Sequence, residues 1–250
     1  MWKSKFYGAF VLNRRVVLHA IDARRLQEMR SWVVSLSILR PFGPSRETGS
    51  PRRRFGKYFE LLFDRFGTPK GGVVTNYLLE KSRTVKPGQG ERNFHVFYQL
   101  VQGAPADERS RLCLLDSADA YPSLASCTSV QGIDDAQEFN DTAKAMADVG
   151  LDDATADLSL RVVAACLALG LLSFSPLAVG DAEGSQIRES APLDAACSLL
   201  HLDPSALKDA LASRTLETMA PGGKTETYQV PLTPTQASLA RDALVKSIYS

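Results

Sequence analysis

Residues 90–100 read GERNFHVFYQL, and no other stretch of the chain constrains its architecture as strongly. The apolar residues in and just after this stretch follow the i, i+3, i+4, i+7 spacing of one helix face: Phe94, Phe97, Tyr98 and Val101. A stripe that carries three aromatic side chains is far more stable in a core than in water. The stretch therefore predicts an amphipathic helix that packs against other elements.

After this helix the pattern remains helical. Asp134 or Asp135 can cap a helix that stops at Gly150. Asp203 and Thr233 each stand before a proline, which is the pattern of an N-cap followed by proline at the first helical position. The predicted helices cover about residues 157–172, 193–200, 205–213 and 233 to the C-terminus. The longest apolar run, residues 162–174, is shorter than the roughly 20 residues of a membrane span, so it predicts a core helix.

Upstream, two apolar runs favour strands. Residues 54–63 are rich in aromatics and predict a largely buried strand, and residues 73–79 open with β-branched residues. A turn rich in glycine and proline separates them, so an antiparallel hairpin is expected. Residues 1–40 show no clean period and receive no element. The resulting fold class is mainly α with a small β component.

Charge is divided unevenly along the chain. Residues 1–100 hold 19 Lys and Arg against 7 Asp and Glu, whereas residues 101–250 hold 10 against 21. Such asymmetry indicates a basic segment for an anionic partner or two regions with different roles. The four cysteines have no C-x-x-C pair and no histidine at ligand spacing, which predicts small buried residues rather than a disulfide framework or a zinc site.

Six segments resemble signatures of the myosin motor head, in the same order. They are residues 54–58 (RFGKY), 76–83 (NYLLEKSR), 90–100, 132–139 (GIDDAQEF), 167–174 and 236–246. The sequence of residues 132–139 is similar to that of class I heads. The resemblance implies that residues 38–250 are a partial motor domain, a fragment of the P-loop NTPase-type myosin head. This fragment would comprise the upper actin-binding subdomain and two strands of the central sheet. Residues 1–37 are then an unassigned basic N-terminal segment.

In this family ATP is hydrolysed with Mg²⁺, and the resemblance places switch I at Arg54, Phe55, Gly56 and Lys57. Arg52 and Arg53 stand where the family has serines that contact the γ-phosphate and Mg²⁺. Arginine has no acceptor atom, so neither residue can ligate a metal; a solvated basic loop is the alternative interpretation.

Two other parts of the ATP machinery are not found in residues 1–250. No G-x-x-x-x-G-K-S/T string occurs there, and switch II is expected only beyond residue 250. No catalytic or metal-binding residue is therefore assigned. The chain alone is expected to bind no cofactor and to be inactive as an ATPase.

The actin side of the resemblance is better preserved. The loop at residues 220–227 matches a family surface loop that touches actin, and its candidate contacts are Gly222, Gly223, Lys224, Thr225, Glu226 and Thr227. The resemblance implies an acid or a phosphorylatable residue sixteen positions before Asp242, and Glu226 stands there, a permanent negative charge. An ordinary exposed glutamate is the alternative. The loop at residues 176–192 matches a second actin-proximal loop.

The resulting hypothesis is a partial motor domain of an actin-based cytoskeletal motor, located in the cytoplasm on the cytoskeleton. Actin filaments are the expected partner, and no light chain or calmodulin is expected because no neck region is present. The alternative is a nucleotide-independent actin-binding module. A third and weaker hypothesis is that the basic front segment binds nucleic acid or an anionic membrane. This segment lacks interleaved exposed aromatics, so no nucleic acid is expected as a partner, and no membrane span is expected.

Overall fold

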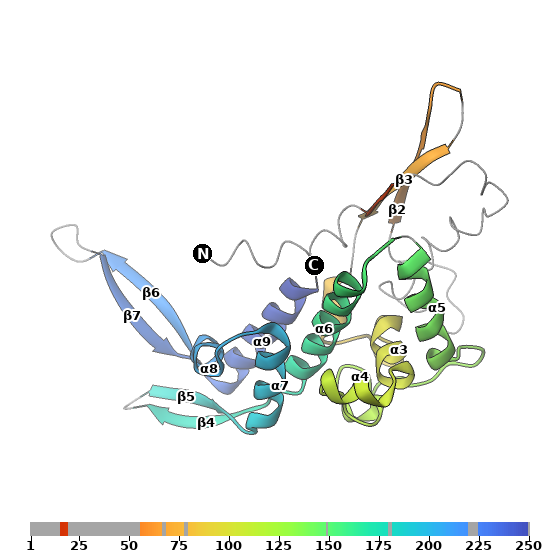
Figure 1. The fold of residues 1–250 in the computed structure, drawn as a ribbon. Coiled ribbons are helices and arrows are strands. Elements are labelled where there is room, and N and C mark those ends of the chain that lie inside the picture. The colour runs from red at the N-terminus through yellow and green to blue at the C-terminus, as the bar shows by residue number, and fades with distance from the viewer. Residues whose placement is uncertain are drawn as a thin grey trace.

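The computed structural model describes residues 16–19, 56–66, 69–77, 80–148, 150–179, 182–219 and 225–249. Within these ranges the protein is mainly helical, as expected, and short antiparallel sheets extend from a helical body (Figure 1). The α-helices are α3 (His95–Gly103), α4 (Ala106–Arg111), α5 (Asp135–Asp148), α6 (Asp153–Gly170), α7 (Ser190–Leu200), α8 (Pro204–Ala212) and α9 (Pro234–Ile248). Two 3-10 turns, η2 (Lys81–Thr84) and η3 (Ala118–Ala120), precede and follow α3.

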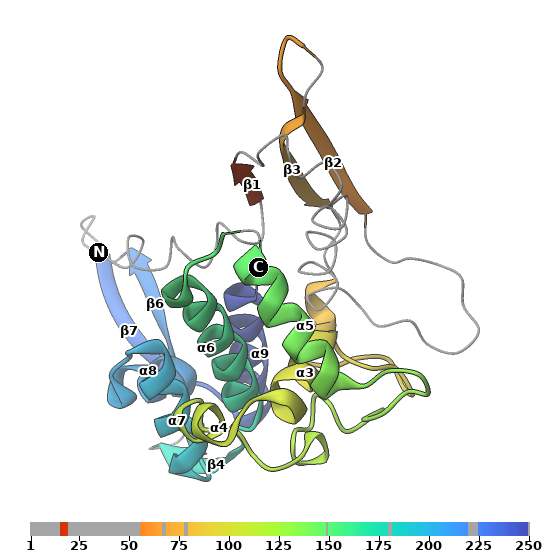
Figure 2. The same cartoon turned by 45° about the vertical axis from the view of Figure 1, so that its right-hand side comes forward.

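Helix α6 is the centre of the helical body. It contacts α3, α5, α7 and α9, and every residue from Val163 to Leu169 is buried (Figure 2). A helix with apolar residues on all sides needs neighbours on all sides, and the surrounding helices supply them. The prediction of a core helix in this run is confirmed, although α6 begins at Asp153, about four residues earlier than expected.

The aromatic stripe of α3 lies in this core, as its spacing predicts. Phe94, Phe97, Tyr98 and Val101 are each at most 1% exposed. The helix packs on α5 and α6, and its last residue, Gly103, lies so close to Phe139 of α5 that an added Cβ would overlap the Phe139 side chain. The close approach of α3 and α5 thus depends on a residue without a side chain.

The helix starts follow local capping chemistry. The Asp203 carboxylate accepts from the Ala206 N–H at 3.1 Å, with Pro204 at the first helical position. Thr233 and Gln236 form a capping box at the start of α9. Asp134 Oδ1 accepts from the Gln137 N–H at 3.0 Å at the start of α5. All three predicted caps are confirmed.

The first sheet has strand order β1-β3-β2 and is antiparallel throughout, with β1 at Val16–His19, β2 at Gly56–Phe63 and β3 at Pro69–Tyr77. The predicted β2–β3 hairpin is confirmed, but β3 begins at Pro69, four residues earlier than expected. Strand β1 pairs with β3 from Val16 opposite Val74 to His19 opposite Gly71, in a segment for which the sequence predicted no element.

The far end of β2 is more exposed than the sequence predicts. Leu62 is 43% exposed and Phe63 is 56% exposed, so the expectation of a largely buried strand is wrong at this end. The hairpin projects from the helical body there (Figure 1), and the register shifts between Leu62 and Phe63. An apolar strand end without a covering layer leaves its side chains in water.

Two further hairpins lie partly in the segments 176–192 and 220–227, which were predicted as loops. Strands β4 (Phe174–Val179) and β5 (Ala182–Ile187) take up most of residues 176–192, and β6 (Ser213–Met219) pairs with β7 (Thr225–Pro231). In a two-stranded hairpin each strand is an edge, so Pro176 can lie in β4 without interrupting a larger sheet. The loop assignments are therefore wrong for residues 176–179, 182–187 and 225–227, while residues 220–224 lie outside the described residues.

The cysteines divide into two groups. Cys166 and Cys197 are buried, whereas Cys113 is exposed and Cys127 is half-buried, so the expectation of four buried cysteines is wrong for the latter two. Full burial raises the pKa of the Cys166 thiol to about 12, since the thiolate would lose its hydration.

Candidate functional site

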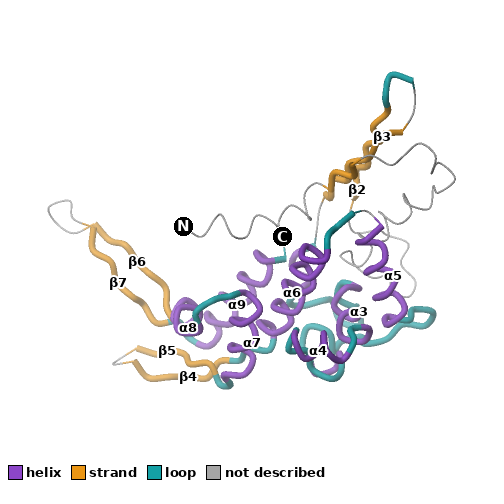
Figure 3. The backbone as a smooth tube through the Cα atoms, viewed as in Figure 1, coloured by secondary structure: helices purple, strands orange, loops and turns teal. Residues whose placement is uncertain are grey.

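The β6–β7 hairpin is held by helices at both ends of its base. Strand β6 follows α8 directly, β7 leads into α9 through Leu232, and the Leu232 N–H donates to the Ala212 carbonyl at 2.8 Å (Figure 3). The strands pair from Ser213 opposite Pro231 to Met219 opposite Thr225. The hairpin thus presents its strands to solvent from a fixed base.

Gln229 fixes the register near this base. Its side-chain amide donates to Thr215 Oγ1 at 3.0 Å, and its Oε1 accepts from Ser213 Oγ at 3.1 Å. The two hydrogen bonds cross from β7 to β6 on one face of the hairpin. A one-residue slip of the strands would break both of them and move the side chains to the other face.

The opposite face of β7 carries Glu226 and Tyr228. Residues two apart on a strand point to the same side, and the Tyr228 hydroxyl donates a hydrogen bond to Glu226 Oε2. Both side chains are exposed, and the hydrogen bond to the carboxylate raises the pKa of the Tyr228 phenol. Glu226 therefore presents an accessible carboxylate that a neighbouring hydroxyl holds on one side.

The structure corrects the predicted environment of this carboxylate. Thr225, Glu226 and Thr227 lie on strand β7 rather than in a surface loop, opposite Met219, Thr218 and Glu217. The other three candidate contacts, Gly222, Gly223 and Lys224, lie outside the described residues. The neighbouring hairpin contributes too, because β5 contacts β7.

The predicted switch I residues lie in a different sheet. Gly56 and Lys57 open β2, opposite Tyr77 and Asn76, while Arg54 and Phe55 lie outside the described residues, as do Arg52 and Arg53. Figure 2 shows β2 and the β6–β7 hairpin on different sides of the helical body. The structure therefore does not bring the two groups of predicted site residues together.

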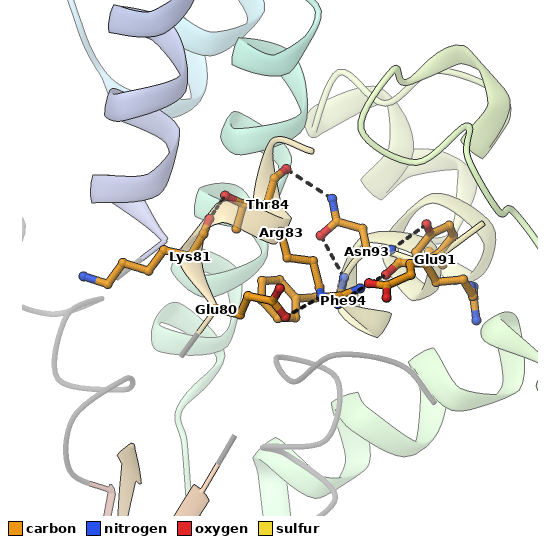
Figure 4. Close-up of polar contacts among 9 residues, drawn as sticks. Glu80, Lys81, Arg83, Thr84, Glu91, Asn93 and Phe94 are labelled. Atoms are coloured by element: carbon orange, nitrogen blue, oxygen red, sulfur yellow. Dashed lines mark hydrogen bonds and ion pairs between the residues drawn. The ribbon is translucent and has the colours of Figure 1, made fainter. Parts of the chain in front are cut away.

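A buried polar cluster, which we call the Arg83 cluster, was missed by the sequence analysis. The Arg83 guanidinium donates to the Arg92 carbonyl at 2.8 Å and pairs with Glu80 at 3.1 Å and with Glu91 (Figure 4). Asn93 Nδ2 donates to the Thr84 carbonyl at 3.1 Å. Together these contacts fasten η2 to the start of α3.

A second buried ion pair adjoins this cluster. Arg92 Nη2 lies 2.6 Å from Asp135 Oδ2, and the side chains are 0% and 4% exposed. The Arg92 guanidinium also stacks over the Tyr98 ring, 3.8 Å from its centroid. Burial raises the pKa of the Asp135 carboxyl, and the Arg92 charge opposes that shift. The pair ties the first residue of α5 to the segment before α3.

A signal for both arginines was available in the sequence. Arg92 stands inside the 90–100 stretch, two residues before the aromatic stripe, and an arginine that is buried beside a core helix needs an acidic partner. Arg83 stands between Glu80 and Glu91 in the same way. Spacing alone could not identify Asp135, which is 43 residues away.

The described residues offer no metal site and no membrane span. Among them, no three His, Cys, Asp or Glu side chains converge so that they could hold a metal ion. Within the same ranges, none of the helices combines the length and apolar character needed to cross a bilayer.

Comparisons with known proteins agree on one family. The family model described as Myosin head (motor domain) matches residues 30–250. Unconventional myosin-Ib from Homo sapiens is 42% identical over 98% of this chain and 21% of its own length. Myosin-1 from Malassezia globosa is 43% identical over 79% and 15%, and Myosin IA heavy chain from Dictyostelium discoideum is 41% identical over 85% and 22%. The chain thus spans about a fifth of these relatives.

Proposed function

Because this chain belongs to the myosin head (motor domain) family, we propose that it is part of an actin-based motor and that its own contribution is an actin-binding surface. The observation that carries the proposal is the exposed side chain of Glu226 on a hairpin whose base is closed by the hydrogen bond between Leu232 and Ala212. This residue lies sixteen positions before Asp242 of α9, which opens the sequence Asp-Ala-Leu-Val-Lys. The family resemblance assigns to this position the negative charge that supports actin binding.

A carboxylate at this position acts without a kinase. A serine or threonine would carry negative charge only after phosphorylation, whereas the Glu226 carboxyl group needs no modification. Attraction between this exposed charge and positive charge on a partner is screened by salt. We therefore expect binding that weakens steeply as the ionic strength rises.

We do not propose that this chain alone binds or hydrolyses ATP. Myosin heads use ATP and Mg²⁺, but here Arg52 and Arg53 stand in place of the oxygen-bearing serines, and residues 1–250 contain no G-x-x-x-x-G-K-S/T string. These residues do not fit Mg-ATP, because arginine offers no ligand atom to the metal. We expect no phosphate release from the purified chain, with or without filamentous actin. Saturable, actin-stimulated release would contradict this expectation.

A nucleotide-independent actin-binding module is the second candidate. It is favoured by the attachment of the β6–β7 hairpin to α8 and α9, in a sheet separate from the predicted switch I residues Gly56 and Lys57. Pelleting with actin filaments in the presence and absence of Mg-ATP tests this candidate. Equal pelleting is expected of a nucleotide-independent module, and release by ATP would contradict it.

The actin proposal is tested by co-sedimentation at low and at physiological ionic strength. We expect weak, salt-sensitive pelleting of the unmodified chain and a clear loss with Glu226→Lys. The matched control is Asp148→Lys, the same charge reversal at an exposed residue of α5, away from the hairpin in Figures 1 and 2. No pelleting at low salt, or equal effects of both substitutions, would overturn the proposal. Association with cytoskeletal filaments in cells is the corresponding expected location.

A further inference from the structure

The Glu226 carboxylate is not an isolated surface charge. Its Oε2 accepts a hydrogen bond from the Tyr228 hydroxyl, and among the described residues no Lys or Arg forms an ion pair with it. Tyr228 is 51% exposed, so about half of its surface is covered. The register places Leu216, which is half-buried, directly opposite Tyr228 on β6.

This arrangement limits how the two side chains can move. A glutamate on an exposed strand has three rotatable side-chain bonds and samples several rotamers, whereas tyrosine has two and carries a flat ring. Residues directly opposite each other on a ladder share a face, and a leucine at that position restricts the space open to an aromatic ring. The Tyr228 hydroxyl is therefore a better defined point than the glutamate that it contacts.

We propose that Tyr228 is a positioning residue that fixes the direction of the Glu226 carboxylate on the outer face of β7. The inference rests on the proposed actin-binding function and adds a second residue to it. The charge offered to actin is then presented by a Glu–Tyr pair on a strand. Without the hydroxyl the charge remains, but the carboxylate must be ordered when actin binds, and this ordering weakens binding.

The first test uses actin co-sedimentation at low salt with the full chain. We expect Tyr228→Phe, which keeps the ring and the charge, to weaken binding by about twofold to tenfold, the range of one exchanged hydrogen bond. Glu226→Gln should weaken it further. Tyr228→Phe added to Glu226→Gln should have little additional effect, because the charge to be positioned is already absent. Asp148→Asn is the control for removal of a carboxylate elsewhere.

The second test follows the phenol directly. Tyrosine Cζ chemical shifts, with Tyr228 assigned by its loss in Tyr228→Phe, should show this phenol titrating at higher pH in the unmodified chain than in Glu226→Gln. A merely structural tyrosine would titrate alike in both proteins. Equal titration would overturn the inference whatever the actin result.

The pelleting outcomes separate this inference from the function on which it rests. If Glu226→Gln weakens pelleting and Tyr228→Phe does not, the inference is wrong and the actin-binding function stands. If the unmodified chain does not pellet at all, the function fails and the inference fails with it. Weakening by both substitutions, with a double variant no weaker than Glu226→Gln alone, supports the inference.

Discussion

Tyr249, the residue after α9, lies flat against Phe94, the residue before α3, with ring centroids 4.8 Å apart and ring planes 3° apart. Phe97 also contacts the Tyr249 ring, at 5.6 Å. The two ends of the helical body are thereby joined in one aromatic group. Burial raises the pKa of the Tyr249 phenol well above its ordinary value, as expected for a hydroxyl carried into a core.

Removing this ring should therefore destabilise the helical body. We expect Tyr249→Ala to lower the free energy of unfolding by about 3–5 kcal/mol, the usual range for truncation of a buried aromatic. Tyr249→Phe keeps the stacked ring and should lower it by much less. Urea unfolding followed by circular dichroism measures both values. Equal losses would show that the hydroxyl, and not the stacked ring, stabilises this contact.

Breaking the Arg92–Asp135 ion pair should lower the free energy of unfolding by a similar amount. Asp135→Ala leaves the Arg92 guanidinium charged and buried, which should lower the free energy of unfolding by about 3–5 kcal/mol. The control is Asp157→Ala, which breaks the pair with Arg111, whose side chain is 47% exposed. Exposed pairs contribute at most about 1 kcal/mol, so the control should change little. If both variants unfold at the same urea concentration, Asp135 does not compensate the buried charge.

Two glycines near helix ends provide a matched test of close packing. Gly103→Ala places a Cβ 2.8 Å from Phe139 Cγ, and we expect it to lower the free energy of unfolding by about 1–3 kcal/mol through overpacking. At Gly170 the nearest atom, Ser123 Oγ, is 3.9 Å away. Gly170→Ala should be neutral or stabilise α6 by about 0.5–1 kcal/mol. Thermal unfolding of the two variants compares them, and a stabilising Gly103→Ala would contradict the packing seen here.

The Asp203 cap predicts part of the acid dependence of stability. Hydrogen bonds from the Ser205 hydroxyl and the Ala206 N–H lower the pKa of Asp203 in the folded chain. The cap therefore contributes stability above the unfolded pKa of about 3.9, and this contribution is lost as the pH falls through the lower folded value.

Asn at this position caps without titrating, so Asp203→Asn should make the melting temperature less sensitive to acid between about pH 5 and about pH 2. Calorimetry at several pH values measures the effect. Asp152→Asn should act in the same sense, because hydrogen bonds from Thr155 lower the pKa of Asp152. If the melting temperature of both variants fell with pH as steeply as that of the unmodified chain, the caps would not be the source of the acid dependence.

Local patterns predicted the helical body well. The stripe from Phe94 to Val101 and the caps at Asp203 and Thr233 depend on residues within one or two helical turns of each other, and the structure has them where the spacing requires. The β4–β5 and β6–β7 hairpins were not predicted as strands. Their two-stranded ladders are exposed on both faces over much of their length and lack the alternation that marks a half-buried strand.

The candidate site was predicted only in part, for the same reason. Spacing from Asp242 located Glu226, but its partner Tyr228 follows from the strand conformation of β7, which a loop assignment conceals. The Arg92–Asp135 pair joins residues that are distant in sequence, and no periodicity connects them. Contacts of this kind become visible only when the helices are packed.

The position of β1 has a consequence for the order of folding. Strands β2 and β3, β4 and β5, and β6 and β7 each pair with their neighbour in the chain, so these hairpins need only short loops to close. Val16 of β1 must instead meet Val74 across more than fifty residues of chain. Closing so long a loop costs conformational entropy, and this cost slows the formation of the pairing. In a pulsed hydrogen-exchange experiment, the amides of β1 should gain protection after those of the three hairpins, and in the native state they should be among the first to exchange.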